Sequence, residues 1–273
     1  MLSLIIPASN EAAWIGPCLA AVVASRPVAG GVEVIVVANG CRDRTAEVAR
    51  GFAGQMPQGW ALRVIELVQG SKPLALNAGS AAATGTARAW LDADCVLSPG
   101  VLAALAAALD RAVPTYAGAT PVIPAARSWV TRAYARFWQH LPFARAVAPG
   151  YGLYAVNAAG RARWEEFPDI ISDDTFVRLQ FAPAERVQVA ETYAWPMVEG
   201  FAALVQVRRR QDRGVRELAV LWPELMAHEG KPRLTPAALV GMALHDPQGF
   251  AVYAAVALAV RAKHGDARFT RGR

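Results

Sequence analysis

The chain carries, at positions 89–95, the stretch Ala89-Trp90-Leu91-Asp92-Ala93-Asp94-Cys95, an apolar run that ends in two carboxylates. The turn residues Ser98-Pro99-Gly100 follow, so the pattern predicts a buried strand that opens into a loop. Because successive side chains of a strand point to opposite faces, we expect Asp92 and Asp94 to point to the same side. Two carboxylates this close favour a positive charge between them, and a hard divalent cation fits. Taken alone, the pair is explained more simply by a solvated acidic loop.

Composition limits the class of protein. The 273 residues suffice for one large domain with a full hydrophobic core. Hydrophobic residues make up 54% of the chain, and the net charge is +6. A basic chain favours an anionic partner, such as nucleotide phosphates or acidic lipid headgroups. Nucleic acid is not favoured, because no stretch interleaves basic and aromatic residues.

Cysteine spacing and apolar runs predict a cytoplasmic location. The three cysteines, Cys18, Cys41 and Cys95, are far apart and have no metal-ligand spacing, so we expect reduced thiols. Met1 leads directly into a strand-like run without the basic segment of a secretory signal. No uninterrupted apolar run reaches the ~20 residues that span a bilayer.

Strand-like and helix-like segments alternate through the first 110 residues. The predicted strands are 2–7, 34–37, 62–67 and 87–91, and the helical patterns lie near 15–23, 46–52, 72–83 and 101–109. Near-continuous apolar strands are typical of a parallel sheet covered by helices on both faces. Such sheets bind ligands beyond the carboxyl ends of their strands. Glu11, Asn39 and the Asp92/Asp94 pair all follow strand ends, which predicts a site there.

Two common nucleotide-binding motifs are missing. The first strand–helix turn is Pro7-Ala8-Ser9-Asn10-Glu11, where a dinucleotide fold needs glycines to admit a pyrophosphate. Gly70-Ser71-Lys72 lacks the upstream glycine of a P-loop.

Four motifs together resemble family 2 glycosyltransferases of the GT-A fold. In order, they are Leu4-Ile5-Ile6-Pro7-Ala8-Ser9-Asn10-Glu11, Val36-Val37-Ala38-Asn39-Gly40-Cys41, Lys72-Pro73-Leu74-Ala75-Leu76-Asn77-Ala78-Gly79 and Asp92-Ala93-Asp94. The resemblance covers roughly residues 1–215 and implies an α/β fold with a Rossmann-like, mostly parallel sheet, helices on both faces and a C-terminal helical extension.

On this basis we divide the chain into two parts. Residues 1–215 would form the catalytic domain, with a nucleotide-binding half at 1–110 and an acceptor half at 111–215. Residues 216–273 would form the helical extension.

The resemblance also implies a donor site. In the family the Asp-x-Asp motif holds Mg²⁺ or Mn²⁺ against the diphosphate of a nucleotide-sugar, so Asp94 would be the metal ligand and Asp92 would face the metal or the ribose. Departure of a nucleoside diphosphate builds up negative charge, which a metal neutralises. The other donor-binding positions that the resemblance implies are Pro7, Ala8, Glu11, Asn39, Lys72 and Arg209.

Three of these positions leave alternatives open. The family commonly has aspartate where Asn39 stands, and an amide both accepts and donates, so uridine is only the first choice of base. Lys72 is either near the nucleotide or a solvated residue at a helix start. Arg209 lies in a segment that loosely resembles the family's Gln-x-x-Arg-Trp, and it would contact the diphosphate unless the run is solvated or forms a patch for anionic lipid. Arg210 stands in place of the tryptophan, which argues against a processive polymer synthase.

The acceptor site would involve two further segments. Gly150-Tyr151-Gly152 matches a small-residue turn that lines the acceptor site in the family. Asp173 and Asp174 match an acidic pair whose second member is the general base, so Asp174 would take the proton of the acceptor hydroxyl, with Asp173 as the alternative. One in-line displacement would then invert the anomeric configuration. A helix N-cap at Ser172 or Asp173 would explain only one of the acids.

Two apolar segments are compatible with either a protein core or another role. An amphipathic helix predicted over 129–141 either packs in the core or forms an acceptor-facing or membrane-facing wall. Phe250 to Val260 is too short to span a bilayer. It either packs on the catalytic domain or lies on an anionic membrane surface beside Arg261 and Lys263.

The sequence therefore predicts a metal-dependent, inverting glycosyltransferase, cytoplasmic or peripheral at the inner membrane face. It would move a hexosyl group from a nucleotide-sugar, with a UDP-sugar as first choice, to a lipid, glycan or small-molecule hydroxyl. The resemblance implies a role in cell-envelope polysaccharide or glycolipid biosynthesis. The alternatives are a sugar nucleotidyltransferase and a catalytically weak nucleotide-binding scaffold of the same fold.

Overall fold

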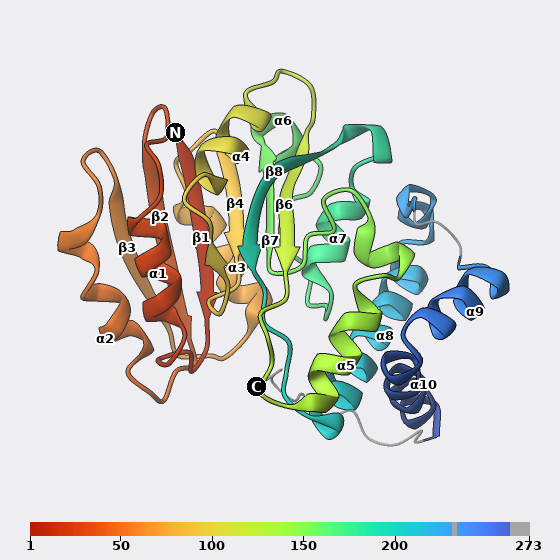
Figure 1. Ribbon diagram of the computed structural model, residues 1–273. Helices are drawn as coiled ribbons and strands as arrows, with labels where there is room; N and C mark the ends of the chain where they lie inside the picture. Colours follow the sequence, from red (N-terminus) through yellow and green to blue (C-terminus); the bar gives the residue numbers. More distant parts are fainter. Residues whose placement is uncertain (231–233, 263–273) are drawn as a thin grey trace.

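Four apolar strands from the first 91 residues form the parallel part of an eight-stranded sheet (Figure 1). The computed structural model describes residues 1–230 and 234–262. The strand order is β3-β2-β1-β4-β7-β6-β8-β5. The parallel strands are β1 (Leu2–Ala8), β2 (Val32–Asn39), β3 (Ala61–Leu67) and β4 (Ala87–Leu91). The predicted parallel sheet is therefore present, with a topological switch at β1.

The rest of the sheet is mixed. The remaining strands are β5 (Val96–Leu97), β6 (Tyr116–Val122), β7 (Leu153–Asn157) and β8 (Arg186–Ala194). β7 is antiparallel to both β4 and β6, whereas β8 is parallel to β6 and antiparallel to β5. It follows that β6 and β8 run in the same direction as β4, so their carboxyl ends reach the same edge of the sheet.

Neither β6 nor β8 was predicted from the sequence. β6 contains Gly118 and Pro121, which are unfavourable in strand interiors. β8 alternates between more and less buried residues, many of them polar, so it lacks the apolar run that marks the central strands.

Helices cover both faces of the sheet, as the alternation predicted. α1 (Ile15–Val23), α2 (Thr45–Arg50) and α4 (Val101–Leu109) pack on the face that carries Leu4 and Ile6. α3 (Lys72–Ala82) and α7 (Asp173–Leu179) pack on the face that carries Ile5 and Trp90. The short helices are α6 (Ala158–Arg161), η1 (Ala53–Gln55), η2 (Pro142–Arg145), η3 (Pro183–Glu185) and η4 (Pro223–His228).

Four helices form a third cluster at one side of the sheet (Figure 1). They are α5 (Trp129–Trp138), α8 (Phe201–Leu221), α9 (Pro236–His245) and α10 (Pro247–Ala262). α10 packs on α5 and α8, with Tyr253 stacked on Tyr134 at 5.5 Å and Val256 fully buried. The predicted domain boundary at 215 falls inside the continuous helix α8.

This cluster bears on the two apolar segments whose role the sequence left open. α5 and α10 pack against each other, although their outer faces keep exposed side chains such as Trp129 and Leu258. Within residues 1–230 and 234–262, no helix has the length and apolar character needed to cross a bilayer. Lys263, which flanks the second segment, lies outside the described residues.

Gly79 lets α3 lie directly on β1 and β2. A Cβ atom at Gly79 would collide with Cγ2 of Ile5 and would lie 3.3 Å from Cγ2 of Val37. We expect Gly79→Ala to lower the free energy of unfolding by about 1–3 kcal/mol, because overpacking forces the helix off the sheet. Gly241→Ala in α9 is the matched control, since an added Cβ there meets no atom within 4 Å. Equal denaturant midpoints for the two variants would contradict this close packing.

Candidate functional site

The carboxyl ends of the central strands open into a cavity of about 530 Å³. The chain leaves β1 toward β2 and β3 and then returns to β4 on the other side of β1. Ligands of open α/β sheets bind at such a switch point. The end of β2 and the loops that follow β1, β3, β4 and β8 line the cavity, and α5, α7 and α8 complete it.

Asp92 and Asp94 line this cavity directly after β4. Both side chains are partly exposed, whereas Ala93 between them is buried, so the two carboxylates share one side. The backbone N–H of Asp92 donates to the carbonyl of Gly152 at 2.8 Å, which fixes the turn against the start of β7.

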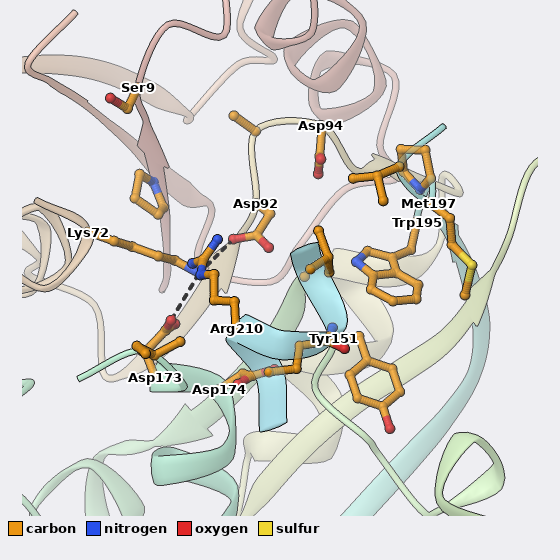
Figure 2. Close-up of a pocket in the computed structure, with 18 of the residues that line it drawn as sticks. Ser9, Lys72, Asp92, Asp94, Tyr151, Asp173, Asp174, Trp195, Met197 and Arg210 are labelled. Atoms are coloured by element: carbon orange, nitrogen blue, oxygen red, sulfur yellow. Dashed lines mark ion pairs between the residues drawn. The ribbon is translucent and has the colours of Figure 1, made fainter. Parts of the chain in front are cut away.

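Lys72 joins the aspartate turn to a second acidic group (Figure 2). Its Nζ lies 3.1 Å from Oδ1 of Asp92 and 3.0 Å from Oδ1 of Asp173. Burial opposes the charge of this ammonium, but the nearby carboxylates, led by Asp173, outweigh burial and raise the pKa of Lys72. Lys72 is therefore a charged residue of the cavity rather than a solvated residue at a helix start.

Asp173 and Asp174 occupy the first turn of α7. Asp173 is buried, and the hydroxyl of Tyr154 donates to its Oδ2 at 3.0 Å. Ser172 is the N-cap residue but makes no side-chain capping bond. Capping therefore does not account for this acidic pair, in which Asp173 pairs with Lys72 and Tyr154.

The environment of Asp174 favours its protonated form. Burial of the carboxyl group and then the charge of Asp173 raise the pKa of Asp174 to about 6, although Lys72 opposes the shift. Its Oδ1 accepts a hydrogen bond from the backbone N–H of Thr175 at 2.6 Å. A carboxyl group with this pKa changes charge close to neutral pH.

Five acidic and three basic side chains line the cavity. Burial and then the charges of Asp94 and Asp92 raise the pKa of the Cys95 thiol. Among the described residues, no group of three or more His, Cys, Asp or Glu side chains could hold a metal by itself. Any cation bound here would thus depend on one or two protein carboxylates and on other ligands.

The predicted base-binding positions lie mainly at the ends of β1 and β2. Pro7, Glu11 and Asn39 line the cavity. Asn39 is buried, and its Nδ2 donates to the carbonyl of Ala8 at 3.0 Å. Ala8 itself is buried and is not part of the cavity lining. Gly40 has a positive φ, as expected for the turn after Asn39.

Aromatic side chains form the opposite end of the cavity. Tyr151 stacks on Trp195 with ring centroids 5.3 Å apart, and Trp138 lies 5.5 Å from Tyr151. Figure 2 shows Tyr151, Trp195 and Met197 gathered away from Lys72. Trp195 and Met197 were not predicted from the sequence, because they follow β8, which was not predicted either.

The predicted acceptor turn is only partly in the cavity. Tyr151 and Gly152 line it, but Gly150 lies outside the lining. Gly152 has a positive φ, and a Cβ atom there would lie 2.6 Å from the sulfur of Cys95. Gly150 also has a positive φ, and an added Cβ atom there would collide with the hydroxyl of Tyr116.

The register of α8 corrects the prediction for Arg209. Its guanidinium donates to the carbonyls of Ala259 and Val260 at the end of α10, outside the cavity. Arg208 and Arg210 line the cavity instead. Each helical residue turns by ~100°, so neighbours on α8 point to different sides.

Close packing brings α8 to the acidic pair. Gly214 lies against Ile171 and Ser172, just before α7, where a larger residue would collide with Ser172. Arg210 is one helical turn earlier, and Figure 2 shows its side chain pointing toward the side of the cavity that holds Lys72 and Asp92.

Comparisons with known proteins agree with this architecture. The family model described as glycosyl transferase family 2 matches residues 3–162. Glycosyltransferase AglE of Haloferax volcanii is 39% identical over 94 residues, which are 34% of this chain and 30% of AglE. The match thus spans less than a third of that curated relative.

Solved structures share the fold. Mannosyltransferase PcManGT from Pyrobaculum calidifontis, in complex with GDP-Man and Mn²⁺, has a TM-score of 0.61 and 19% identity, with 97% of this chain and 76% of that chain covered. S. aureus TarS 1–349 in complex with UDP has a TM-score of 0.55 and 16% identity, with 77% and 63% covered. Glucosyl-3-phosphoglycerate synthase from Mycobacterium tuberculosis, in complex with Mn²⁺, UDP and glucosyl-3-phosphoglycerate, has a TM-score of 0.55 and 22% identity, with 85% and 81% covered. These identities establish the GT-A fold alone.

The raised pKa of Asp174 predicts that its carboxylate destabilises the folded protein. The folded pKa of about 6 exceeds the ordinary value of 3.8, so folding disfavours the ionised form. The ionised carboxylate therefore lowers the free energy of unfolding. This loss of stability is small near pH 4, grows as pH rises, and reaches its full size above pH 6. We expect Asp174→Asn to raise the free energy of unfolding by about 1–3 kcal/mol at pH 8 and to change it little at pH 4.

Thermal unfolding at the two pH values measures this effect, with Asp173→Asn as the matched control. Asp173→Asn weakens the ion pair to Lys72, so it should destabilise the protein at pH 8. Destabilisation of similar size by both substitutions at pH 8 would contradict the assignment for Asp174.

Proposed function

We propose that this chain, which belongs to glycosyl transferase family 2 and is therefore a glycosyltransferase, transfers a sugar from a nucleotide-sugar to an acceptor hydroxyl. The transfer would invert the anomeric configuration of the sugar and would use a divalent cation. The observation that carries this proposal is the ion-pair bridge of Lys72 between Asp92 and Asp173. It brings the turn after β4 and the start of α7, about 80 residues apart, into one cavity.

The residues present fit a bound Mg²⁺ or Mn²⁺. Asp92 and Asp94 offer carboxylate oxygens on one side of a cavity that is lined by more acidic than basic side chains. Mg²⁺ is usually held by one or two carboxylates together with substrate phosphates, so a cage of three protein ligands is not required. When bound, the cation would neutralise negative charge that develops on the departing diphosphate. PcManGT and the glucosyl-3-phosphoglycerate synthase are described as complexes with Mn²⁺, which supports this choice.

The nucleotide would lie along the ends of β1 and β2. The amide nitrogen of Asn39 already donates to Ala8, which leaves its oxygen as the group that can accept a hydrogen bond from a base N–H. The N3–H of uracil suits this acceptor, so a UDP-sugar is the first choice of donor. Pro7 and Glu11 complete this part of the wall.

Lys72 would connect the donor site to the proposed general base. Its ammonium lies within 3.1 Å of both Asp92 and Asp173, so it limits the separation between the donor-side and base-side carboxylates. An ammonium here also offers a positive charge to diphosphate oxygens. Arg210 would add a guanidinium on the same side of the cavity.

Asp174 would act as the general base. With a pKa of about 6 it is largely ionised at pH 7.5 and basic enough to accept a proton. The acceptor oxygen would lose its proton to the Asp174 carboxylate as it forms a bond to the anomeric carbon. The bond to the diphosphate oxygen breaks on the opposite face, so this single displacement inverts the anomeric configuration.

Nucleotide binding tests the donor site. We expect UDP with Mn²⁺ to raise the midpoint of thermal unfolding by several degrees, because a ligand at 100 times its Kd stabilises by about 2.7 kcal/mol. Asp94→Ala should lose this shift, since it removes the proposed metal ligand. Asp174→Asn should keep the shift and lose transfer by about 10²–10⁴-fold. GDP, CMP and dTDP are the comparison nucleotides.

Equal loss of nucleotide binding in Asp94→Ala and Asp174→Asn would contradict the division of roles. Absence of a Mn²⁺-dependent shift with all four nucleotides, in folded protein, would overturn the proposed donor site.

The pH dependence of transfer tests the general base. Because only the ionised carboxylate accepts a proton, kcat/KM should fall about 10-fold per pH unit below pH 6 and level off above pH 7. The measurement is the initial rate of nucleoside diphosphate release between pH 5 and 8, at saturating Mn²⁺. A rate that stays constant down to pH 5 would exclude Asp174 as the base.

A further inference from the structure

Resting on the proposed function, we propose that the acceptor carries an anionic group, a phosphate or carboxylate, and that Arg208 binds this group at the aromatic end of the cavity. This contact would define the chemical class of the second substrate.

Asp212, Tyr253 and Tyr134 are side-chain partners that hold the Arg208 guanidinium in place. Its Nε donates to Oδ1 of Asp212 at 2.9 Å, one turn further along α8. Its Nη1 donates to the hydroxyl of Tyr253 on α10 at 3.3 Å, and its Cζ lies 5.8 Å from the centre of that ring. A guanidinium has five N–H donors, so these contacts orient the group and leave donors for a ligand. Preorganisation of this kind lowers the entropy cost of binding.

The side-chain partners of Arg208 come from other elements than the aspartate pair of the proposed donor site. Its contacts are with α5, α10 and its own helix, whereas Asp92 and Asp94 follow β4. Lys72 and Arg210 are cations on the donor side (Figure 2). A second substrate is therefore the better partner for Arg208.

The charge of the cavity bears on which ligand Arg208 could bind. Four aspartates, namely Asp92, Asp94, Asp173 and Asp174, line the cavity, and Lys72 and Arg210 offset only part of their negative charge. Asp212 neutralises part of the Arg208 charge, but the fixed guanidinium still offers donors to an anion in the cavity, and its planar donors suit bidentate contact with oxyanions.

The cluster that contains Tyr253, the ring partner of Arg208, indicates what accompanies the anionic group. It also contains cavity residues, of which Trp138, Tyr151 and Trp195 offer ring faces and Met197 and Leu204 offer aliphatic surface. Such a wall suits a sugar ring or an apolar chain beside the charge. The shared chemistry is thus an anion attached to an apolar or ring-shaped group, from a soluble metabolite or from a lipid headgroup.

Binding to the full chain, loaded with UDP and Mn²⁺, tests the proposal by calorimetry at constant ionic strength. Two probes carry phosphate: glycerol 3-phosphate represents soluble acceptors, and octyl phosphate represents amphiphiles. Glycerol and octyl glucoside are their neutral counterparts. We expect at least one anionic probe to bind about 10-fold more tightly than its counterpart. The tighter of the two phosphates then distinguishes a lipid source from a soluble one.

Substitutions assign the preference to Arg208. Arg208→Gln should weaken the anionic probe about 10-fold and leave nucleotide affinity unchanged. Arg216→Gln is the matched control, because Arg216 lies on the same helix with an exposed side chain. It removes the same charge but should leave the affinity for the probe unchanged.

Tyr253→Phe tests the positioning role of Tyr253. It keeps the ring packing on Tyr134 and Phe137 but removes the hydroxyl that contacts Arg208. We expect an approximately threefold loss of affinity for the anionic probe, with nucleotide affinity retained. An unchanged affinity would show that Tyr253 does not position Arg208.

The proposal is overturned if neither phosphate binds the nucleotide-loaded protein, if neutral counterparts bind equally well, or if Arg208→Gln binds like the wild type. Failure of UDP and the other nucleotides to bind is a different result, because it overturns the proposed donor site instead.

Discussion

One ammonium group, the Nζ of Lys72, connects acidic groups that lie far apart in the sequence. It pairs with Asp92 after β4 and with Asp173 at the start of α7. Lys72 can do so because α3 begins beside the switch point of the sheet, where Ser71 caps the helix. Gly79 then allows α3 to lie on β1 and β2. The position of one charge thus depends on how closely a helix packs on the sheet.

The cavity combines groups that repel one another, and this has a cost in stability. Asp174 is held where burial and the charge of Asp173 favour its neutral form. The Lys72 ammonium offsets part of the repulsion within the acidic cluster. Active sites commonly retain such unfavourable groups because their altered pKa values serve the chemistry. The proposed cation and diphosphate would add positive and negative charge to this same cluster of carboxylates.

A second constraint comes from the helices beside the sheet. Three consecutive arginines on α8 have different surroundings: Arg208 and Arg210 line the cavity, whereas Arg209 contacts carbonyls at the end of α10. α10 also contributes Tyr253, which contacts Arg208. The C-terminal helices therefore help to shape the wall of the cavity, and α8 continues through the boundary predicted at residue 215.

Local features of the sequence were enough to predict the parallel strands, the helices between them and the convergence of Glu11, Asn39 and the Asp92/Asp94 pair, because apolar periodicity and strand ends are visible in short stretches. The family resemblance also located the acidic pair at 173–174. Which side chains enter the cavity depends instead on tertiary packing. β6 and β8 lack a strong local signal, so Trp195 was missed, and helix packing alone placed Arg208 rather than Arg209 in the wall. The physical reason is that the direction of a side chain depends on contacts between segments far apart in the sequence, which local patterns do not encode.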